Sequence, residues 1–390
     1  MRILHLITAL ETGGAETALA RLLSRLDRAE FEPLVVSLVP PGWMAAELDR
    51  LAVPVAHLDM RRGRPTPGGL WRLRGVLRRF DPHLLQTWLY HADLLGLLGA
   101  RLARPLGGGP PVVWNLRCAY MDLARYPRTT ALTLRACARL SARPACVLAN
   151  SRAALDWHRS LGYRPRRAEV IGNGIDADLF RPDAVARAEV RAELGLAADA
   201  PVLVTAARFD PMKDVPGLLG AAARVLAAWP EARWLLCGRG MEPGNAELAA
   251  LLAAAGLSGR AGDAASLAPV RLLGQRGDMP RLLAAADLAV SASRGESFPN
   301  AVAEALACGL PCAATDAGAT AELVAEAGRV VPIEDPEALA RAVLELLALP
   351  PEERARLGAA GRERIRAGHS LEAQAAAYAA LYRELARPGA

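Results

Sequence analysis

Two glutamates, Glu296 and Glu304, lie in the stretch G-E-S-F-P-N-A-V-A-E, which could bind an anion together with neighbouring hydroxyl groups. The apolar run 286–293 predicts a buried strand before it, and A-V-A-E-A-L-A-C-G predicts a helix that ends at Gly309. We expect Pro299 in the first turn of that helix, where a missing N–H costs nothing. A helix N-terminus favours an anion, and five residues of helix span roughly 7–8 Å. The spacing therefore suits a sugar–diphosphate–nucleoside, with one carboxylate at each end.

Two cations, Arg208 and Lys213, stand five residues apart in A-A-R-F-D-P-M-K-D, directly after a predicted strand over 201–206. Lys213 is the only lysine in the chain, and all other basic residues counted as Lys or Arg are arginine. A single remaining lysine indicates a position that needs a compact ammonium rather than a guanidinium, although chance survival is the alternative. Two cations beside a helix start could converge on a diphosphate.

These residues require an alternation of strands and helices to position them. Alternating strand-like and helical runs predict open parallel sheets with helices on both faces, and such sheets bind ligands beyond the carboxyl ends of their strands. A polar stretch over 176–199 separates two such halves, which join near residue 180. The expected strands are 3–8, 34–39, 53–58, 83–87, 112–116 and 146–150, then 201–206, 233–237, 270–273, 288–293 and 312–314.

Taken in order, these motifs resemble those of the retaining glycosyltransferases of family 4 (glycosyl transferases group 1), together with G-G-A-E near the N-terminus, V-I-G-N-G-I-D and D-A-G-A-T-A-E. The sequence departs from the family pattern at four positions: Gly172 stands where proline is usual, and Ala207, Asp214 and Ala319 stand where glycine is usual. Both cations are nevertheless present. The resemblance covers nearly the whole chain.

The resemblance implies the GT-B fold, in which two Rossmann-like parallel-sheet domains face each other across a cleft. It implies an acceptor-binding domain over 1–178 and a nucleotide-sugar-binding domain over 179–368. The segment 369–390 would be a helix that crosses back to the first domain. A resemblance at this level also implies that the first domain sets the acceptor.

The resemblance also implies roles for individual residues. Glu296 would bind hydroxyls of the transferred sugar and Glu304 those of the ribose, while Arg208 and Lys213 would neutralise the diphosphate as it leaves. The implied catalytic residues are His91, Arg208, Lys213 and Glu296, and the implied donor contacts are Gly13, Gly14, Arg208, Lys213, Gly238, Arg276, Glu296, Phe298, Pro299, Asn300 and Glu304.

The family histidine that contacts the transferred sugar has two possible positions here. His91 follows the predicted strand 83–87, but many relatives carry the histidine three positions earlier, where this chain has Trp88. Asn115 and Arg117 belong to the polar stretch 114–123 at the end of strand 112–116, where they would face the acceptor or pack a loop.

The expected reaction is transfer of a sugar, with retention, from a UDP- or GDP-linked donor to a glycan or lipid-linked acceptor of an envelope, capsule or exopolysaccharide. We expect no cofactor and no metal, because the six cysteines lack ligand spacing and no D-x-D-type motif lies in a suitable loop. A nucleotide-sugar epimerase or a non-catalytic nucleotide-sugar-binding scaffold remains the alternative. A phosphorylase would need a pyridoxal-phosphate lysine, and the only lysine already matches the diphosphate position.

The chain has a net charge of +6, with arginines crowded over 61–79 and 159–167. This indicates either an ordinary basic surface or contact with an anionic membrane or phosphorylated acceptor. No nucleic-acid module is evident. The N-terminus predicts a strand rather than a signal peptide, and no apolar run reaches membrane-span length, so we expect a cytoplasmic protein, with peripheral contact at the inner face of the plasma membrane as an option.

Overall fold

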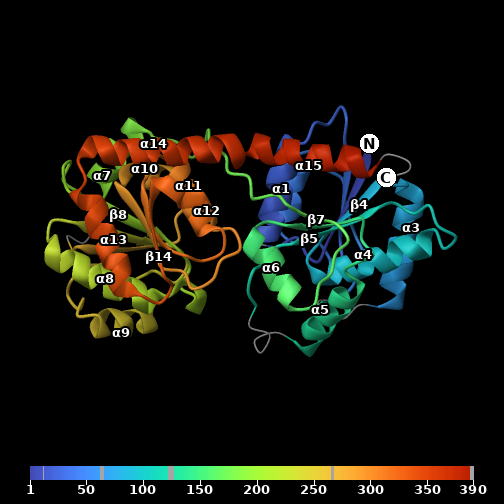
Figure 1. Cartoon of the computed structure of the whole chain (residues 1–390), viewed down its shortest axis with the longest axis horizontal. Helices are drawn as coiled ribbons and strands as arrows, with labels where there is room; N and C mark the ends of the chain where they lie inside the picture. The colour runs from blue at the N-terminus through green and yellow to red at the C-terminus, as the bar shows by residue number, and fades with distance from the viewer. Residues whose placement is uncertain (12, 62–65, 122–126, 265–267, 387–390) are drawn as a thin grey trace. The chain divides into compact units, whose positions relative to one another are not determined.

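The computed structural model describes residues 1–390 except 12, 62–65, 122–126, 265–267 and 387–390. The chain divides into two compact units, one formed by Met1–Gly174 with Leu371–Ala390 and the other by Ile175–Ser370 (Figure 1). Each unit contains a seven-stranded parallel sheet, which confirms the prediction of two α/β halves. The expected domain limits at 178 and 368 stay predictions.

The first unit has the strand order β3-β2-β1-β4-β5-β6-β7. The order reverses between β1 and β4, and a crevice at such a point is where open α/β sheets bind ligands. Its strands are β1 Arg2–Ile7, β2 Glu32–Ser37, β3 Val55–His57, β4 Leu84–Trp88, β5 Val112–Leu116, β6 Cys146–Ala149 and β7 Ala168–Val170. Its helices are α1 Gly14–Arg25, α2 Met44–Arg50, α3 Pro67–Phe80, α4 Tyr90–Ala103, α5 Arg128–Leu140, α6 Arg152–Ser160 and α15 Leu371–Leu385.

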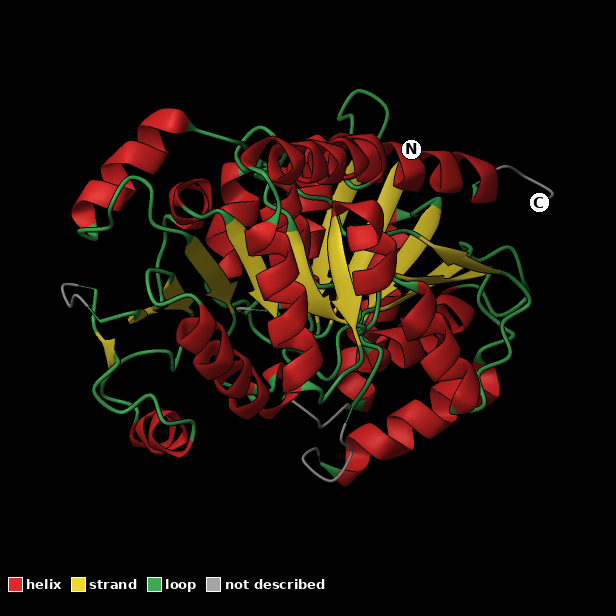
Figure 2. Cartoon of the chain, turned by 60° about the vertical axis from the view of Figure 1, so that its left-hand side comes forward, coloured by secondary structure: helices red, strands yellow, loops and turns green. Residues whose placement is uncertain are grey.

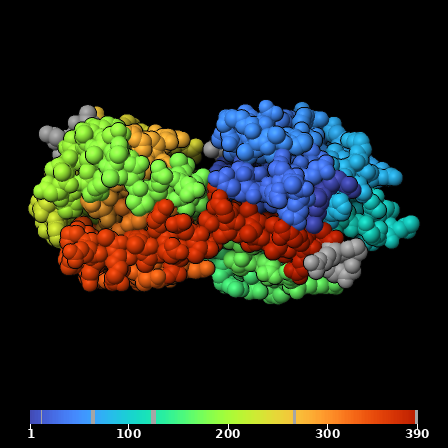
Figure 3. All heavy atoms as spheres, turned by 90° about the horizontal axis from the view of Figure 1, so that it is seen from above, coloured from blue at the N-terminus to red at the C-terminus, as the bar shows by residue number. Residues whose placement is uncertain are grey.

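Both faces of the first sheet are buried, and successive side chains of each strand point to opposite faces. Ile3 and Ile7 of β1 join the core under α1 and α15, whereas Leu4 and Leu6 join the core under α3 and α4. Helix α15 packs against α1, and Figure 3 shows these C-terminal residues (red) against the N-terminal residues (blue). Residues near the end of the chain therefore complete the core of the first unit.

The second unit has the strand order β10-β11-β9-β8-β12-β13-β14, with its reversal between β8 and β12. Figure 2 shows strands (yellow) between layers of helices (red). Its strands are β8 Val202–Ala206, β9 Arg233–Cys237, β10 Ala261–Gly262, β11 Val270–Gly274, β12 Leu288–Ser291, β13 Cys312–Thr315 and β14 Gly328–Val331. Its helices are α7 Ala184–Glu193, α8 Val215–Ala228, α9 Ala246–Ala254, α10 Met279–Ala285, α11 Asn300–Ala307, α12 Thr320–Val324, α13 Pro336–Ala348 and α14 Pro351–Gly368, with short 3₁₀ turns η2 Pro211–Lys213 and η3 Ala325–Ala327.

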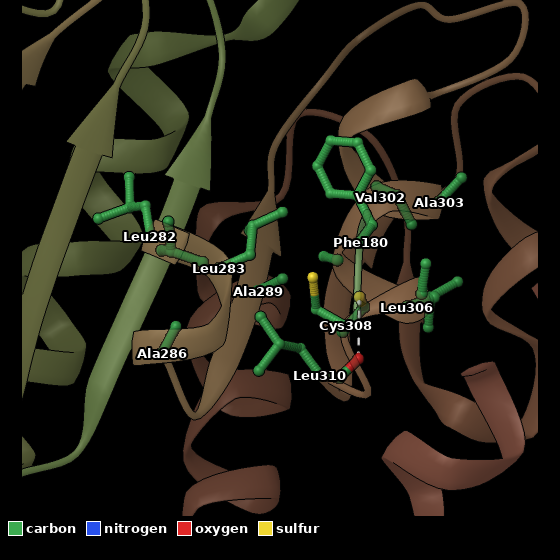
Figure 4. Packing of buried hydrophobic residues seen from close by; sticks show 14 of the residues in the cluster. Phe180, Leu282, Leu283, Ala286, Ala289, Val302, Ala303, Leu306, Cys308 and Leu310 are labelled. Atoms are coloured by element: carbon green, nitrogen blue, oxygen red, sulfur yellow. Dashed lines mark hydrogen bonds between the residues drawn. The ribbon is translucent and has the colours of Figure 1, made fainter. Parts of the chain in front are cut away.

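The second sheet is also covered on both faces. Figure 4 shows Leu282 and Leu283 of α10 near Ala289 of β12, with Val302 and Leu306 of α11 in the same cluster. This layer anchors the start of α11, which is the helix that the G-E-S-F-P-N motif introduces. The burial of α11 on the sheet thus fixes the position of the motif.

Three short strands, β7, β10 and β14, were not predicted. Strands β7 and β14 lie at sheet edges and bear partly exposed side chains, so they lack the continuous apolar run that marks a central strand. The small and polar residues over 258–269 predict a surface loop, but this prediction is wrong at Ala261–Gly262, which pairs with β11. All six cysteines are free thiols. Among the described residues, no helix combines the length and apolarity needed to cross a membrane.

Candidate active site

Lys213 and Glu296 meet at the carboxyl ends of β8 and β12, the two strands at which the order of the second sheet reverses. Nζ of Lys213 donates to Oε1 of Glu296, and Oγ of Ser293 donates to the same oxygen at 2.8 Å. The side chains of Lys213 and Glu296 are 20% and 16% exposed. All three residues line a pocket that also includes Pro299. The structure thus brings together two of the four expected catalytic residues.

The loop after β8 positions Lys213 through two aspartates. Asp210 accepts from the backbone N–H of Met212 at 2.9 Å, which caps the turn η2 that ends at Lys213. Asp214 then adopts a left-handed conformation (φ 45°) and caps α8 by accepting from Gly217 N–H at 3.3 Å. Aspartate tolerates this region better than most residues. It therefore fits a position where the family pattern has glycine, and it also provides a helix cap.

The loop that carries Glu296 is held by the segment after β13. Oγ1 of Thr315 donates to the Ser293 carbonyl at 2.6 Å, and Ala319 N–H donates to the Ser297 carbonyl at 3.1 Å. Gly318 has φ +65°, and a Cβ there would lie 2.2 Å from the Glu296 carbonyl oxygen. Only glycine fits both the conformation and the space. The D-A-G-A segment therefore supports the backbone of Glu296.

The start of α11 differs from the expectation in one detail. Pro299 has φ −75° and ψ 86°, so it precedes the helix as the N-cap residue and is not in the first turn, because its ψ is not helical. The phenyl ring of Phe298 is buried, with its centroid 5.5 Å from that of His369, so only its backbone is left to face a ligand. Asn300 and Glu304 are half-buried in α11.

Arg208 lies in the same loop as Lys213 but has a different environment. Its Nη2 lies 3.2 Å from Oδ2 of Asp210, and its side chain is 59% exposed. The structure therefore does not bring Arg208 into the contact between Lys213 and Glu296. Its guanidinium faces solvent, where a bound anion could recruit it.

Gly238 and Arg276 have structural partners of their own. The N–H of Gly238 donates to the Gly274 carbonyl at 2.7 Å, and a Cβ on Gly238 would lie 2.0 Å from the Ala207 carbonyl. Gly238 therefore supports the loop after β8 by close backbone contact, and its N–H is already used. Arg276 pairs with Asp278 at 2.7 Å and with Glu193 at 3.0 Å, and it lowers the pKa of Asp278.

In the first unit, the glycine turn before α1 is covered by a carboxylate. Gly13 is the N-cap residue of α1, and a Cβ on it would lie only 2.3 Å from Oε2 of Glu16. Glu16 is buried, so its charge occupies the helix N-terminus where the resemblance implied a diphosphate. A Cβ on Gly14 would meet nothing within 4 Å among the described atoms. The sequence does not predict this position of Glu16, because the local sequence does not show that its side chain turns back towards Gly13.

The two candidate positions for the family histidine differ in burial. Trp88 is buried, and its indole N–H donates to Nδ1 of His5 at 3.4 Å. His91 lies in the first turn of α4 and is half-buried; burial lowers its pKa, so the imidazole is neutral near pH 7. Among the described residues, its buried Nε2 has no hydrogen-bond partner. His91 thus remains our predicted counterpart.

Sequence reasoning missed three residues that support the site: Ser293, Arg294 and Gly318. Arg294 pairs with Asp214 at 2.8 Å, and its N–H donates to the Met212 carbonyl at 2.9 Å, which ties the two site loops together. Only Gly318 had a local signal, as a glycine within a recognised motif.

Comparison with known proteins shows the family of this chain. The family model "Glycosyltransferase Family 4" matches residues 12–179, and "Glycosyl transferases group 1" matches residues 200–349. Together they account for most of the chain, one in each unit. The chain belongs to this family of glycosyltransferases.

Among characterised relatives, a D-inositol 3-phosphate glycosyltransferase of Nocardioides sp. is 37% identical over 182 residues, which is 44% of this chain and 39% of the relative. The enzyme of the same name from Thermobispora bispora is 35% identical over 225 residues, which is 56% of this chain and 51% of the relative. The match thus spans about half the length of these relatives or less.

Among solved structures, Anabaena Alr3699/HepE in complex with UDP superimposes with a TM-score of 0.82 at 24% identity, covering 98% of this chain and 100% of that one. The same protein has also been solved in complex with UDP-glucose. At this level of identity the likeness shows the fold, which is that of the GT-B glycosyltransferases.

Proposed function

We propose that this protein transfers a hexose from a UDP-linked donor to a hydroxyl group of an acceptor, with retention of anomeric configuration. The observation that carries the proposal is the contact of Lys213 and Ser293 with Glu296 beside a pocket at the reversal point of the second sheet. This contact supports the proposal, because the Lys213 ammonium would bind a diphosphate and the adjacent Glu296 carboxylate would bind sugar hydroxyls.

The reaction needs stabilisation of the leaving nucleoside diphosphate, which gains negative charge as the glycosidic bond breaks. The Lys213 ammonium would bind that charge, and Arg208 would turn from Asp210 towards the same phosphates. Glu296 would exchange its contact with Lys213 for hydrogen bonds to sugar hydroxyls. We assign no enzyme nucleophile, because the family resemblance implies attack from the face that the diphosphate leaves.

The nucleotide would lie along α11. Glu304 is in the second turn of that helix and half-buried, which suits hydrogen bonds to the ribose hydroxyls. The HepE complexes with UDP and UDP-glucose favour UDP over GDP as the nucleotide here.

For the acceptor, the names of the characterised relatives favour a phosphorylated polyol, inositol 3-phosphate being the first to try. A glycan or lipid-linked acceptor of the cell envelope is the second candidate, and a surface of α3 favours it. Helix α3 carries exposed Trp71 (61%), with Arg72, Arg78 and Arg79 also exposed and no acidic residue. Such a surface suits peripheral contact with anionic lipids.

The membrane contact can be tested by sedimentation with vesicles. The wild-type protein should sediment with phosphatidylglycerol vesicles and not with phosphatidylcholine vesicles, and the double variant Arg78→Glu, Arg79→Glu should stay in the supernatant. Equal sedimentation of both proteins would contradict this part of the proposal.

The transfer reaction is tested with a donor panel of UDP-glucose, UDP-N-acetylglucosamine and GDP-mannose, each with inositol 3-phosphate and with an envelope glycan extract. We expect release of UDP from one donor and a product whose anomeric proton coupling matches that of the donor. Nucleotide binding without release from any donor would favour the scaffold alternative. An inverted product would contradict retention.

A further inference from the structure

Arg117 directly follows β5 in the first unit, and most of its guanidinium has no polar partner. Nη2 donates to Oδ1 of Asn173 at 2.7 Å. Nε and Nη1 are shielded from solvent and have no hydrogen-bond partner in the part of the chain that the structure describes. The guanidinium carbon lies 5.5 Å from the centre of the Trp88 ring, so one face of the cation is in contact with an aromatic surface.

Two further buried polar atoms at the same edge of the sheet also lack a hydrogen-bond partner. Oγ1 of Thr8, which follows β1, and Nε2 of His91, which follows β4, have no partner among the described residues. Strands β1, β4 and β5 are parallel neighbours, so the turns after them lie at one edge. The side chains of Thr8, His91 and Arg117 are each only partly buried, so they are at the rim of the unit and not in its core.

Burial of a guanidinium with unused donors is unfavourable unless another interaction offsets it. The contact with Trp88 offsets a part. The negative charge of Glu16 is also near enough to favour the charged form of Arg117, although burial lowers its pKa. Arginine remains protonated in this setting. The arrangement therefore keeps a cation with two free donors at the same edge of the sheet as the hydroxyl of Thr8, and both groups can donate to an oxyanion bound there.

We propose that Arg117, with Thr8, binds the phosphomonoester of a phosphorylated polyol acceptor, while His91 keeps its predicted contact with the transferred sugar. This rests on the proposed function and assigns the acceptor subsite within it. A tetrahedral phosphate has enough acceptor oxygens for both groups, and guanidinium–phosphate hydrogen bonds are strong because both partners are charged. The donor diphosphate is the other source of such an anion, but Lys213 and Arg208 of the second unit already provide its cations.

The test is isothermal titration of the full chain with D-myo-inositol 3-phosphate, with unphosphorylated myo-inositol and with UDP. We expect the wild-type protein to bind the phosphorylated polyol at least tenfold more tightly than inositol. Arg117→Gln should remove this preference, and Arg117→Lys should keep part of it. The matched control is Arg139→Gln, which makes the same change of charge on the exposed face of α5 and should behave like the wild type.

The UDP titration separates the possible results. Arg117→Gln should bind UDP like the wild type; an equal loss of UDP and of inositol 3-phosphate affinity would identify the anion as the donor diphosphate and overturn the acceptor assignment. A wild-type protein that binds UDP but shows no preference for the phosphorylated polyol would overturn this proposal and leave the proposed function intact. Failure to bind UDP would instead count against the proposed function.

A second variant keeps the proposal testable if Arg117→Gln does not fold. Glu16→Gln removes the negative charge near Arg117, so it should tighten the binding of inorganic phosphate severalfold at constant ionic strength. Unchanged or weaker phosphate binding by this variant would contradict an anion site at Arg117.

Discussion

The two units share a sheet architecture but differ in how their buried polar groups are paired. Among the described residues, twelve buried side-chain nitrogen and oxygen atoms without a hydrogen-bond partner lie in the first unit and only two lie in the second. In the second unit, Asp287 pairs with Arg187 and Arg191, and Arg271 donates to backbone carbonyls. Within the described structure, the second unit therefore pairs nearly all of its buried polar side-chain atoms, while the first leaves many that need water or a ligand.

This difference fits the proposal that the second unit binds the donor and the first unit binds the acceptor. The proposed donor site can be preformed, because a cation and a carboxylate neutralise each other while the site is empty, as the ion pair of Lys213 and Glu296 does. In the first unit, by contrast, the proposed acceptor subsite has no carboxylate that accepts from Arg117. Within the described structure, two nitrogen donors of its guanidinium have no hydrogen-bond partner. Variants in the second unit should therefore change donor turnover and donor binding, whereas those in the first unit should change the pH dependence of stability.

The largest effect is expected from Lys213→Ala. Removing the ammonium takes away charge stabilisation that grows in the transition state, so kcat should fall by about 10²–10³-fold. The fold should persist, because the side chain lies at a pocket and not in the core. Donor turnover and the unfolding transition are measured together.

The matched control for Lys213→Ala is Arg341→Ala, which removes a positive charge from the exposed face of α13 and should leave turnover unchanged. Lys213→Arg sharpens the test: because a guanidinium is larger and planar, we expect it to recover only part of the lost rate. Turnover of Lys213→Ala at the wild-type rate would contradict the site.

The next effect concerns Gly318, whose lack of a side chain allows the close approach to the Glu296 carbonyl. Gly318→Ala should destabilise the second unit by about 1–3 kcal/mol, because it combines a positive φ with a clash against backbone. It should also weaken donor binding, since Glu296 must move. Chemical denaturation and UDP-sugar titration measure the two effects.

Gly244→Ala is the control for Gly318→Ala, because a Cβ at Gly244 would meet nothing within 4 Å and no left-handed φ is involved. It should change neither stability nor donor affinity by a measurable amount. Equal behaviour of the two variants would show that the close contact at Gly318 has no functional weight.

A third prediction concerns pH and the first unit. Burial, with a smaller contribution from Arg28, lowers the pKa of His5 to about 3. The unfolded histidine, with a pKa near 6.5, binds a proton that the folded one does not, so stability falls as pH drops from about 6.5 towards 3. At pH 5 the loss is about 2 kcal/mol from this residue.

The measurement is urea unfolding at pH 7 and pH 5, followed by hydrogen exchange to assign the change to one unit. His5→Gln cannot titrate, so it should lose about 2 kcal/mol less than the wild type between the two pH values. His158, whose pKa burial lowers to about 4, should contribute in the same unit and direction. A loss of stability at pH 5 that is confined to the second unit would contradict the assignment of this pH dependence to the first unit.

The smallest effect is expected from Glu304→Gln. Replacing the carboxylate by an amide keeps the size of the side chain on α11 but weakens hydrogen bonds to ribose hydroxyls, so the Kd for UDP should rise about tenfold. Binding of inositol 3-phosphate should not change, because the acceptor subsite that we propose lies in the other unit. An unchanged Kd for UDP would remove Glu304 from the donor site.

Much of this architecture could be predicted from the sequence, because central parallel strands are continuous apolar runs with glycine- or proline-marked ends. The contact of Lys213 with Glu296 could be predicted for the same reason, since both residues follow central strands that end at one edge of the sheet. What could not be predicted depends on segments distant in sequence. Gly318 supports Glu296 only through a close approach of two loops, and the unused donors of Arg117 follow from the packing around Trp88.

The chain connectivity of the second unit has a consequence for how such a protein can change over time. Residues 175–370 are one continuous stretch, and their ends lie together: Ile175 and Ser370 form a β-bridge, and Ile175 N–H donates to the His369 carbonyl at 2.8 Å. The first unit, in contrast, needs α15 to complete its core. A single recombination cassette bounded by these two positions could therefore exchange the whole second unit, in which we propose the donor site. One gene could in this way acquire a new sugar specificity while it keeps the acceptor site that we propose in the first unit.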